Sequence, residues 1–262
     1  MKGQGTFLRA HTWFVYLFLY APIAILVLFS FNRASQTAVW QGFTLEWYRS
    51  LARNELILTA VRNSLVVGFA ATVIATVFGT PVALALGRYE FPGKGFTKNL
   101  LYLPIIIPEI VVGAALVTFF GVVALRLSLL TVIIAHVVFS ISYMAIVVRA
   151  RLSGFDRSLE EAALDLGARP LQTFWRVTLP LILPGIVSGA LLVFTVSIDD
   201  YVITSFVAGV GATTLPLQIY SMLKVGVTPE VNAVSTLLLV VTIVLIAVAQ
   251  RLQQPPAEGL RD

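Results

Sequence analysis

Cysteine is absent from this 262-residue sequence, and charged residues and histidines are scarce. Without cysteine the chain has no disulfide framework, no thiolate nucleophile and no cysteine-based metal site. The two histidines, His11 and His136, are too few and too widely separated for a histidine-based metal site. Charged residues make up 12% of the chain and hydrophobic residues 58%, whereas soluble domains carry roughly 25% charged residues. The composition therefore predicts an integral membrane protein.

Six apolar segments are long enough to cross a bilayer as helices, which takes about 20 residues each. Five of them, each 19 to 23 residues long, lie at about 13–31, 64–86, 100–122, 129–148 and 231–249. The remaining segment, the fifth in order, begins at 184. A signal peptide is the alternative for the first segment. That segment is too long for a signal-peptide core and lacks an A-x-A cleavage site, which favours a retained anchor. We therefore expect an all-α bundle of six transmembrane helices.

Small residues and prolines mark where these helices should pack closely or bend. One stripe recurs every four residues in the second segment: Ala71, Ala75, Gly79, Ala83 and Gly87. Together with Gly185-x-x-x-Gly189 in the fifth segment, it predicts close helix–helix approach. In the third segment, Pro104 and Pro108 each remove a backbone donor and predict a kink or an unwound turn.

The distribution of lysine and arginine predicts the orientation. With the amino terminus inside, twelve basic residues lie on the inner side: Lys2, Arg9, Arg88, Lys94, Lys98, Arg149, Arg151, Arg157, Arg169, Arg176, Arg251 and Arg261. Six lie outside: Arg33, Arg49, Arg53, Arg62, Arg126 and Lys224. The positive-inside rule therefore places both termini in the cytoplasm. The net charge of +5 is spread over these loops, which indicates membrane topology and not nucleic-acid binding.

A polar interruption between the fourth and fifth segments is predicted to form a pair of short helices. Ser158 and Glu161 have the spacing of a capping box. Gly167 suits the left-handed conformation that ends a helix, and Pro170 suits the first turn of the next. The first helix carries small and apolar residues on one face. An ordinary surface helix is one interpretation; a docking element is the other, because small residues on a protruding loop indicate close packing with something else.

The spacing Glu161-Ala162-Ala163, then Gly167, then Val177-x-Leu179-Pro180 resembles the EAA loop of bacterial ABC importer permeases. The family pattern has isoleucine where this chain has Val177, a change that keeps the β-branched apolar character. The resemblance implies a MetI-like bundle whose EAA loop is a coupling helix that docks on a cytoplasmic ATPase. Glu161, Ala162, Ala163, Gly167, Leu179 and Pro180 would then carry ATPase coupling.

The same resemblance implies the partners and the division of labour. A second homologous permease, a dimer of cytoplasmic ABC ATPases and a periplasmic substrate-binding protein would complete the machine. No Walker A motif is present: five residues separate Gly87 from Gly93-Lys94, where four are needed, and Gly95 stands where Ser or Thr must hold magnesium. We therefore expect no cofactor and no metal in this chain, no catalytic residues, and ATP with magnesium on the partner ATPase.

Carboxylates within apolar segments are the candidates for a substrate path or gate, because a charge in the bilayer needs a partner or a wet cavity. They are Glu109, Asp199 and Asp200. On a helix the two aspartates would point about 100° apart. Ion pairing that only holds the bundle together is the alternative role. Tyr201 beside them is the best candidate for a cation-binding ring, whereas His136 is expected to be a packed, hydrogen-bonded residue.

Further segments resemble the spermidine/putrescine permeases within this family. They are Ser30-Phe-Asn32, Trp47-Tyr48, residues 197–207, residues 214–222 and residues 226–232. The resemblance implies three parts: an anchor helix with a periplasmic loop (1–61), a permease core (62–250) with the coupling loop at about 150–183, and a cytoplasmic tail (251–262) that we expect to be disordered.

The sequence is thus interpreted as the permease subunit of an ATP-driven importer in the bacterial inner membrane, with polyamines as the expected cargo. Another organic solute is the nearest alternative. A secondary transporter that uses Glu109 or Asp199 for proton coupling would instead transport without ATP. A membrane enzyme is disfavoured, because no nucleophile–base pair or metal cluster is apparent.

Overall fold

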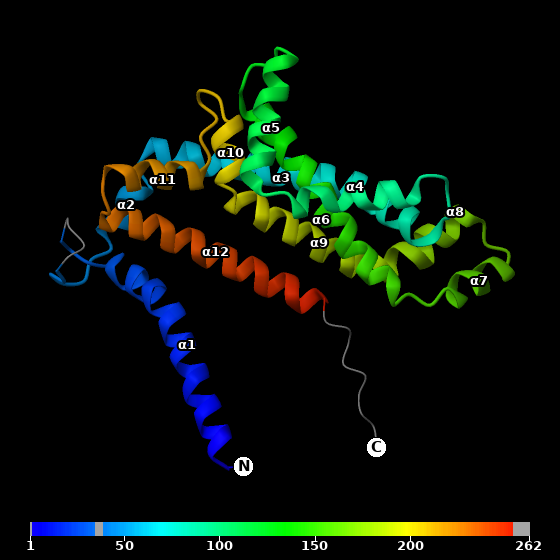
Figure 1. Cartoon of the computed structure of the whole chain (residues 1–262), viewed down its shortest axis with the longest axis horizontal. Coiled ribbons are helices and arrows are strands. Elements are labelled where there is room, and N and C mark those ends of the chain that lie inside the picture. Colours follow the sequence, from blue (N-terminus) through cyan, green and yellow to red (C-terminus); the bar gives the residue numbers. More distant parts are fainter. Residues whose placement is uncertain (1, 35–38, 254–262) are drawn as a thin grey trace. The chain divides into compact units, whose positions relative to one another are not determined.

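The computed structural model describes residues 2–34 and 39–253 and is almost entirely helical there (Figure 1). The helices are α1 (Lys2–Phe29), α2 (Glu46–Leu51), α3 (Glu55–Arg88), α4 (Lys94–Ile106), α5 (Glu109–Val122), α6 (Leu129–Ser153), α7 (Ser158–Asp165), α8 (Pro170–Thr173), the π-helix η1 (Phe174–Thr178), α9 (Leu179–Asp199), α10 (Val202–Val207), α11 (Leu215–Val225) and α12 (Pro229–Gln253). Most of the predicted polar tail lies outside the described residues.

Five helical stretches are long and apolar enough to cross a membrane, namely 11–29, 55–88, 129–153, 170–199 and 229–251. The pair α4 and α5 passes the same test together but is bent by 106° between them. Counted as one broken span, this pair brings the number to the expected six. The predicted kink is therefore confirmed, and it is a complete break rather than a bend in a continuous helix.

The predicted start of the fifth span was wrong. The fifth span does not begin at Pro184, because α8, η1 and α9 follow one another without a gap from Pro170 to Asp199. Pro184 lies inside α9, where its missing donor is tolerated. The segment between the fifth and sixth predicted spans, for which no helix was predicted, contains the eleven-residue helix α11.

The chain divides into two compact units, and the first comprises residues 1–58 and 218–241. In this unit α1 is joined to α2 by a segment organised around Asn32. The Asn32 side chain donates to the Val39 carbonyl (2.8 Å) and accepts from the Gln41 amide (2.9 Å). Trp47 Nε1 donates to the Asn32 carbonyl (2.7 Å). Residues that carried the family resemblance thus tie this segment together.

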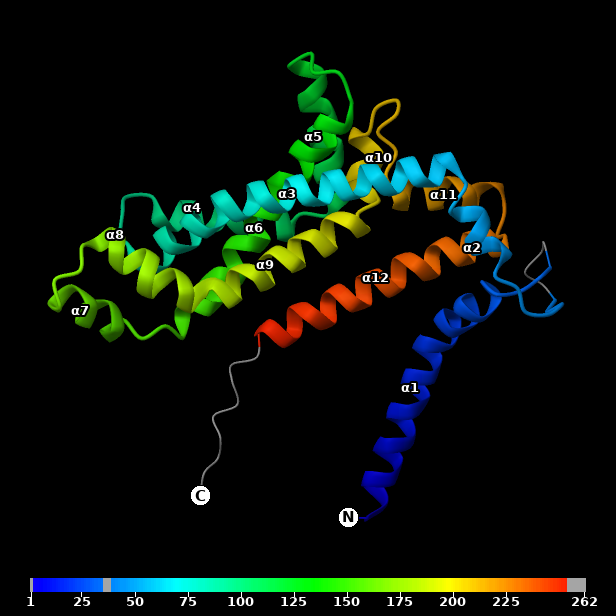
Figure 2. The same ribbon diagram turned by 180° about the vertical axis from the view of Figure 1, so that it is seen from behind.

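The second unit, residues 59–217 and 242–262, has its core where α3, α6 and α9 meet. Figures 1 and 2 show these three helices running alongside one another. Met144 of α6 is fully buried between two glycines. A Cβ atom on Gly79 of α3 would lie 2.8 Å from Met144 Cβ, and one on Gly189 of α9 would lie 2.7 Å from its sulfur. Both predicted small-residue motifs are therefore confirmed as helix contacts.

Candidate functional site

Two helix breaks in the second unit lie next to each other and create an irregular region within the bundle. One is the α4–α5 break at Ile107 and Pro108. The other is the end of α9, where Asp200 is extended (φ −67°, ψ 123°) before α10 begins. The short helix α10 packs against α5, where a Cβ on Gly113 would lie 2.6 Å from the Phe206 ring. Because non-helical backbone at membrane depth is tolerated where it lines a cavity, a site is expected around these breaks.

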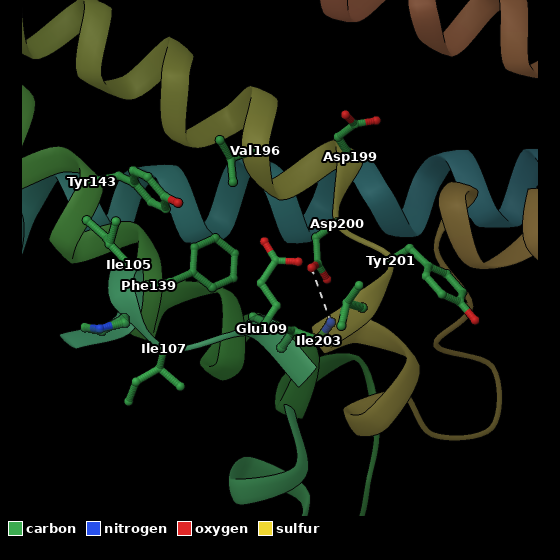
Figure 3. A pocket seen from close by; sticks show the side chains of 12 residues that line it. Ile105, Ile107, Glu109, Phe139, Tyr143, Val196, Asp199, Asp200, Tyr201 and Ile203 are labelled. Atoms are coloured by element: carbon green, nitrogen blue, oxygen red, sulfur yellow. Dashed lines mark hydrogen bonds between the residues drawn. The ribbon is translucent and has the colours of Figure 1, made fainter. Parts of the chain in front are cut away.

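A cavity of about 320 Å³ lies at the two breaks (Figure 3). Its walls come from both sides of each break and from α6. They are Pro104, Ile105, Ile107, Glu109, Phe139, Tyr143, Val196, Asp199, Asp200, Tyr201, Val202 and Ile203. The cavity therefore collects all four residues predicted for the substrate path. It combines apolar and aromatic walls with three carboxylates.

Asp200 is engaged by its own chain. Its carboxylate accepts from the amides of Ile203 (3.3 Å) and Thr204 (2.9 Å) and from the Thr204 hydroxyl (2.8 Å). The dashed line in Figure 3 marks the first of these bonds. Asp200 thereby satisfies the free amides at the start of α10, as a helix cap does. The side chain is almost completely buried, so these bonds are shielded from water.

His136 of α6 lies behind Asp200 and is fully buried. Its Nε2 is 2.9 Å from Thr204 Oγ1 and 3.3 Å from Asp200 Oδ2, and its Nδ1 is 2.6 Å from Ser197 Oγ. Because the Thr204 hydroxyl donates to Asp200, Nε2 is the donor to Thr204. The expectation of a packed, hydrogen-bonded histidine is confirmed. The network joins α6, α9 and α10. The sequence does not reveal it, because His136 lies more than 60 positions from Ser197 and Thr204.

Glu109 and Asp199 differ from Asp200 because both are exposed. Within residues 2–34 and 39–253, neither carboxylate has a hydrogen-bond or ion-pair partner. Glu109 is the first residue of α5, where the helix dipole favours a negative charge. In Figure 3 its side chain points toward the region between Phe139 and Asp200.

The helical phase predicted for the aspartates was wrong. Asp199 ends α9 and Asp200 is already non-helical, so an angle of 100° does not apply. Figure 3 shows the Asp199 carboxylate pointing away from Asp200, and the Tyr201 ring pointing away from Glu109. Tyr201 is among the residues that line the cavity.

The predicted coupling residues form a second group, at the other end of this unit from α10 (Figures 1 and 2). Helix α7 carries Glu161, Ala162 and Ala163, and Gly167 follows with φ +87°, the left-handed conformation predicted for it. Leu179 and Pro180 begin α9, directly after η1. Apolar side chains here stay uncovered by the described chain, with Leu166 90% exposed.

The capping box predicted at Ser158 was wrong. Ser158 is the first helical residue, and its amide donates to Asp156 Oδ1 at 2.9 Å. This backbone hydrogen bond, with a weaker contribution from the Ser158 side chain, lowers the pKa of the exposed Asp156 carboxyl. An aspartate two positions earlier thus performs the role assigned to the serine, which leaves Glu161 free on the surface.

Comparison with known proteins identifies the family. Residues 79–255 match the model of the binding-protein-dependent transport system inner membrane component family. The chain belongs to this family. The match covers the broken spans, the cavity and α7, so the features described above lie within the family's common region.

Individual relatives extend the match to most of the chain. The permease is 42% identical over 245 residues to the spermidine/putrescine transport system permease protein PotC of Haemophilus influenzae, covering 93% of this chain and 95% of the relative. It is 42% identical to the putrescine transport system permease protein PotI of Escherichia coli, covering 86% and 82%. These relatives confirm a transport permease subunit, not an enzyme.

Solved structures show the same fold at lower identity. A bacterial ABC transporter that imports alginate matches with a TM-score of 0.73 at 19% identity, covering 97% of both chains. The MetNI methionine ABC transporter matches with a TM-score of 0.63 at 22% identity, covering 80% of this permease and 97% of that chain. The permease is therefore a MetI-like, multi-pass inner-membrane protein of the ABC importer type.

Proposed function

We propose that this permease imports polyamines such as putrescine and spermidine. The observation that carries the proposal is a pair of carboxylates, Glu109 and Asp199, that line a cavity with apolar walls and have no hydrogen-bond or ion-pair partner in the described part of the chain. Polyamines are ammonium groups separated by methylene chains. Such a molecule matches carboxylates set among Ile105, Ile107 and Phe139, and aromatic faces add attraction for an ammonium group. The names of the relatives agree with this cargo.

Within the proposed site the acidic residues have different tasks. Glu109 and Asp199 bind the cation directly, because their oxygens are not used by the described chain. Asp200 holds the start of α10 in place and supplies negative potential behind the cavity. Tyr201 lines the entrance. Since α5 and α10 pack together, any movement of one broken span changes the cavity.

The energy for transport would come from partners. A second homologous permease completes the pathway, a periplasmic binding protein delivers the cargo, and a dimer of cytoplasmic ATPases binds ATP and magnesium. A solved alginate transporter of this fold was obtained with a pentasaccharide-bound periplasmic protein, which supports the general assembly. Glu161, Ala162 and the other exposed residues of α7 would seat the ATPase, with both termini of the permease in the cytoplasm.

The test is uptake of labelled putrescine and spermidine into proteoliposomes that contain the complete transporter with its binding protein. Glu109→Gln and Asp199→Asn should each lower uptake at subsaturating polyamine by about 10-fold or more, since a hydrogen bond to a charged group contributes about 1.5–3 kcal/mol. Glu90→Gln, which changes an exposed carboxylate in the α3–α4 loop, is the matched control and should transport normally.

Each other outcome identifies a different function. Stimulation of ATPase activity by the binding protein without polyamine uptake would contradict the cargo and point to another organic solute. Uptake that does not depend on ATP would contradict the importer mechanism and point to ion-coupled secondary transport.

A further inference from the structure

Helix α7 carries two neighbouring glutamates that differ in exposure. Glu161, which belongs to the EAA pattern, is exposed. Glu160 is turned toward the permease's own helices, and its side chain is only 17% exposed. The pattern of the sequence groups the two residues together, whereas the structure separates an outward carboxylate from an inward one.

The inward carboxylate joins α7 to two spans. Glu160 Oε1 lies 2.7 Å from Nη2 of Arg88, the last residue of α3. The same oxygen accepts a hydrogen bond from the hydroxyl of Thr178, which ends η1 and precedes α9. Arg88 is 19% exposed and Thr178 is buried. A single side chain therefore connects the starting point of α9 and the end point of α3.

Further contacts fix the partner of Glu160. The Arg88 guanidinium lies over the Phe155 ring, 5.3 Å from its centroid. Arg157, which directly precedes α7, donates to the Gly87 carbonyl at 3.3 Å. A positive charge at the end of α3 also interacts favourably with the helix dipole. The Phe155 ring thus contacts the Arg88 guanidinium, and the bond from Arg157 gives the start of α7 a second attachment to the end of α3.

We infer that Glu160, through Arg88 and Thr178, transmits the movement of α7 to α3 and α9. The inference rests on the proposed docking of α7 on an ATPase. Glu161 and its exposed neighbours receive the movement on the outer face, and Glu160 passes it to the spans on the inner face. Glu160 is a positioning residue in this scheme, since it touches neither cargo nor nucleotide. The π-helix beside it provides a wide turn of the kind often found at functional sites.

The experiment compares four forms of the complete transporter in proteoliposomes: wild type, Glu160→Gln, Arg88→Gln and the double variant. The control is Glu90→Gln, which neutralises an exposed carboxylate of the α3–α4 loop, outside α7 and its proposed docking surface. Three quantities are measured, namely co-purification of the ATPase, ATP hydrolysis stimulated by the binding protein, and polyamine molecules imported per ATP hydrolysed. The number of polyamine molecules imported per ATP hydrolysed reports transmission of the movement. A lower amount of protein, or weaker binding of the ATPase, does not change this ratio.

For each single variant we expect normal co-purification and an import-to-hydrolysis ratio lowered at least about fivefold, the lower end of usual coupling between sites. The double variant should lose less than the product of the single losses, because neither charge is then left alone. An unchanged ratio in Glu160→Gln, or an equal loss in Glu90→Gln, would overturn the inference. If the wild type hydrolyses ATP without importing polyamine, the proposed cargo is refuted, and the inference about Glu160 is tested separately. The readout is then the stimulation of ATP hydrolysis by the binding protein. Unchanged stimulation in Glu160→Gln would overturn the inference.

Discussion

At the scale of single residues, Asp199 and Asp200 show how neighbouring side chains of one type acquire different roles. Asp200 is buried and accepts three hydrogen bonds from α10. Asp199 is exposed and has no partner among the described residues. Helix α9 ends between them, and Asp200 is buried whereas Asp199 is exposed among the residues that line the cavity. One aspartate therefore stabilises the break, and the other remains available to a cation.

This difference predicts opposite effects on stability. Asp200→Ala should lower the free energy of unfolding by about 2–3 kcal/mol, because it removes a charged acceptor and leaves buried donors unpaired. Asp199→Ala should change it by less than about 0.5 kcal/mol, as surface substitutions usually do. Denaturation of the purified permease in detergent measures both values. Equal losses in the two variants would show that Asp199 also has a structural role.

At the scale of helices, the glycines around Met144 explain why α3, α6 and α9 approach closely. A side chain on Gly79 would meet the Met144 Cβ and, at 3.1 Å, the Ile141 carbonyl, neither of which can move without the backbone. A side chain on Gly189 would come too close only to the Met144 sulfur, near the end of a flexible side chain, and the next nearest atoms, Met144 Cε and Val147 Cβ, lie at an ordinary contact distance of 3.5 Å. The two glycines therefore belong to the same contact but should tolerate substitution differently.

We accordingly predict a rank order for three substitutions. Gly79→Ala should destabilise the permease by about 1–3 kcal/mol, the usual cost of overpacking, and Gly189→Ala should cost less. Gly95→Ala, near the start of α4 where nothing lies within 4 Å of the added atom, should be neutral or stabilising. Thermal denaturation in a single detergent gives the order. A larger loss for Gly189→Ala than for Gly79→Ala would contradict it.

The helices also show what the sequence could and could not predict. Apolar length and the small-residue stripes predicted the spans and their contacts, because both depend on local composition. The 106° break at Pro108 exceeded the predicted kink, since a proline permits a break but packing against α10 sets its angle. Helix α11 was missed because turn-forming residues such as Gly211 and Gly226 surround it.

The candidate residues also differ in how far the sequence could predict them. The short helix α7 was located correctly, since its start and end signals lie within one short segment of the sequence. The roles of Glu160 and Asp200 were not predictable, because each depends on residues far away in sequence, namely Arg88 and His136. A sequence pattern cannot distinguish two adjacent residues of the same type, such as Glu160 and Glu161 or Asp199 and Asp200.

At the scale of the whole molecule, the absence of cysteine from the sequence makes the topology directly measurable. The distribution of basic residues predicts that α7 faces the cytoplasm and that the segment after α10 faces the periplasm. Leu166 beside α7 is 90% exposed, and Val210 after α10 is completely exposed. A cysteine introduced at either position would therefore be reached by a reagent on its own side of the membrane.

We predict that a membrane-impermeant maleimide labels Val210→Cys in intact spheroplasts and labels Leu166→Cys only after the membrane is opened. The physical reason is that the reagent cannot cross the bilayer, whereas the described part of the chain leaves both positions exposed. Because a docked ATPase would shield Leu166, the permease is expressed without its partners, and their addition should then slow labelling there and not at Val210. The unmodified chain gives the background. Labelling of Leu166→Cys in intact spheroplasts would reverse the proposed orientation and remove α7 from the reach of a cytoplasmic ATPase.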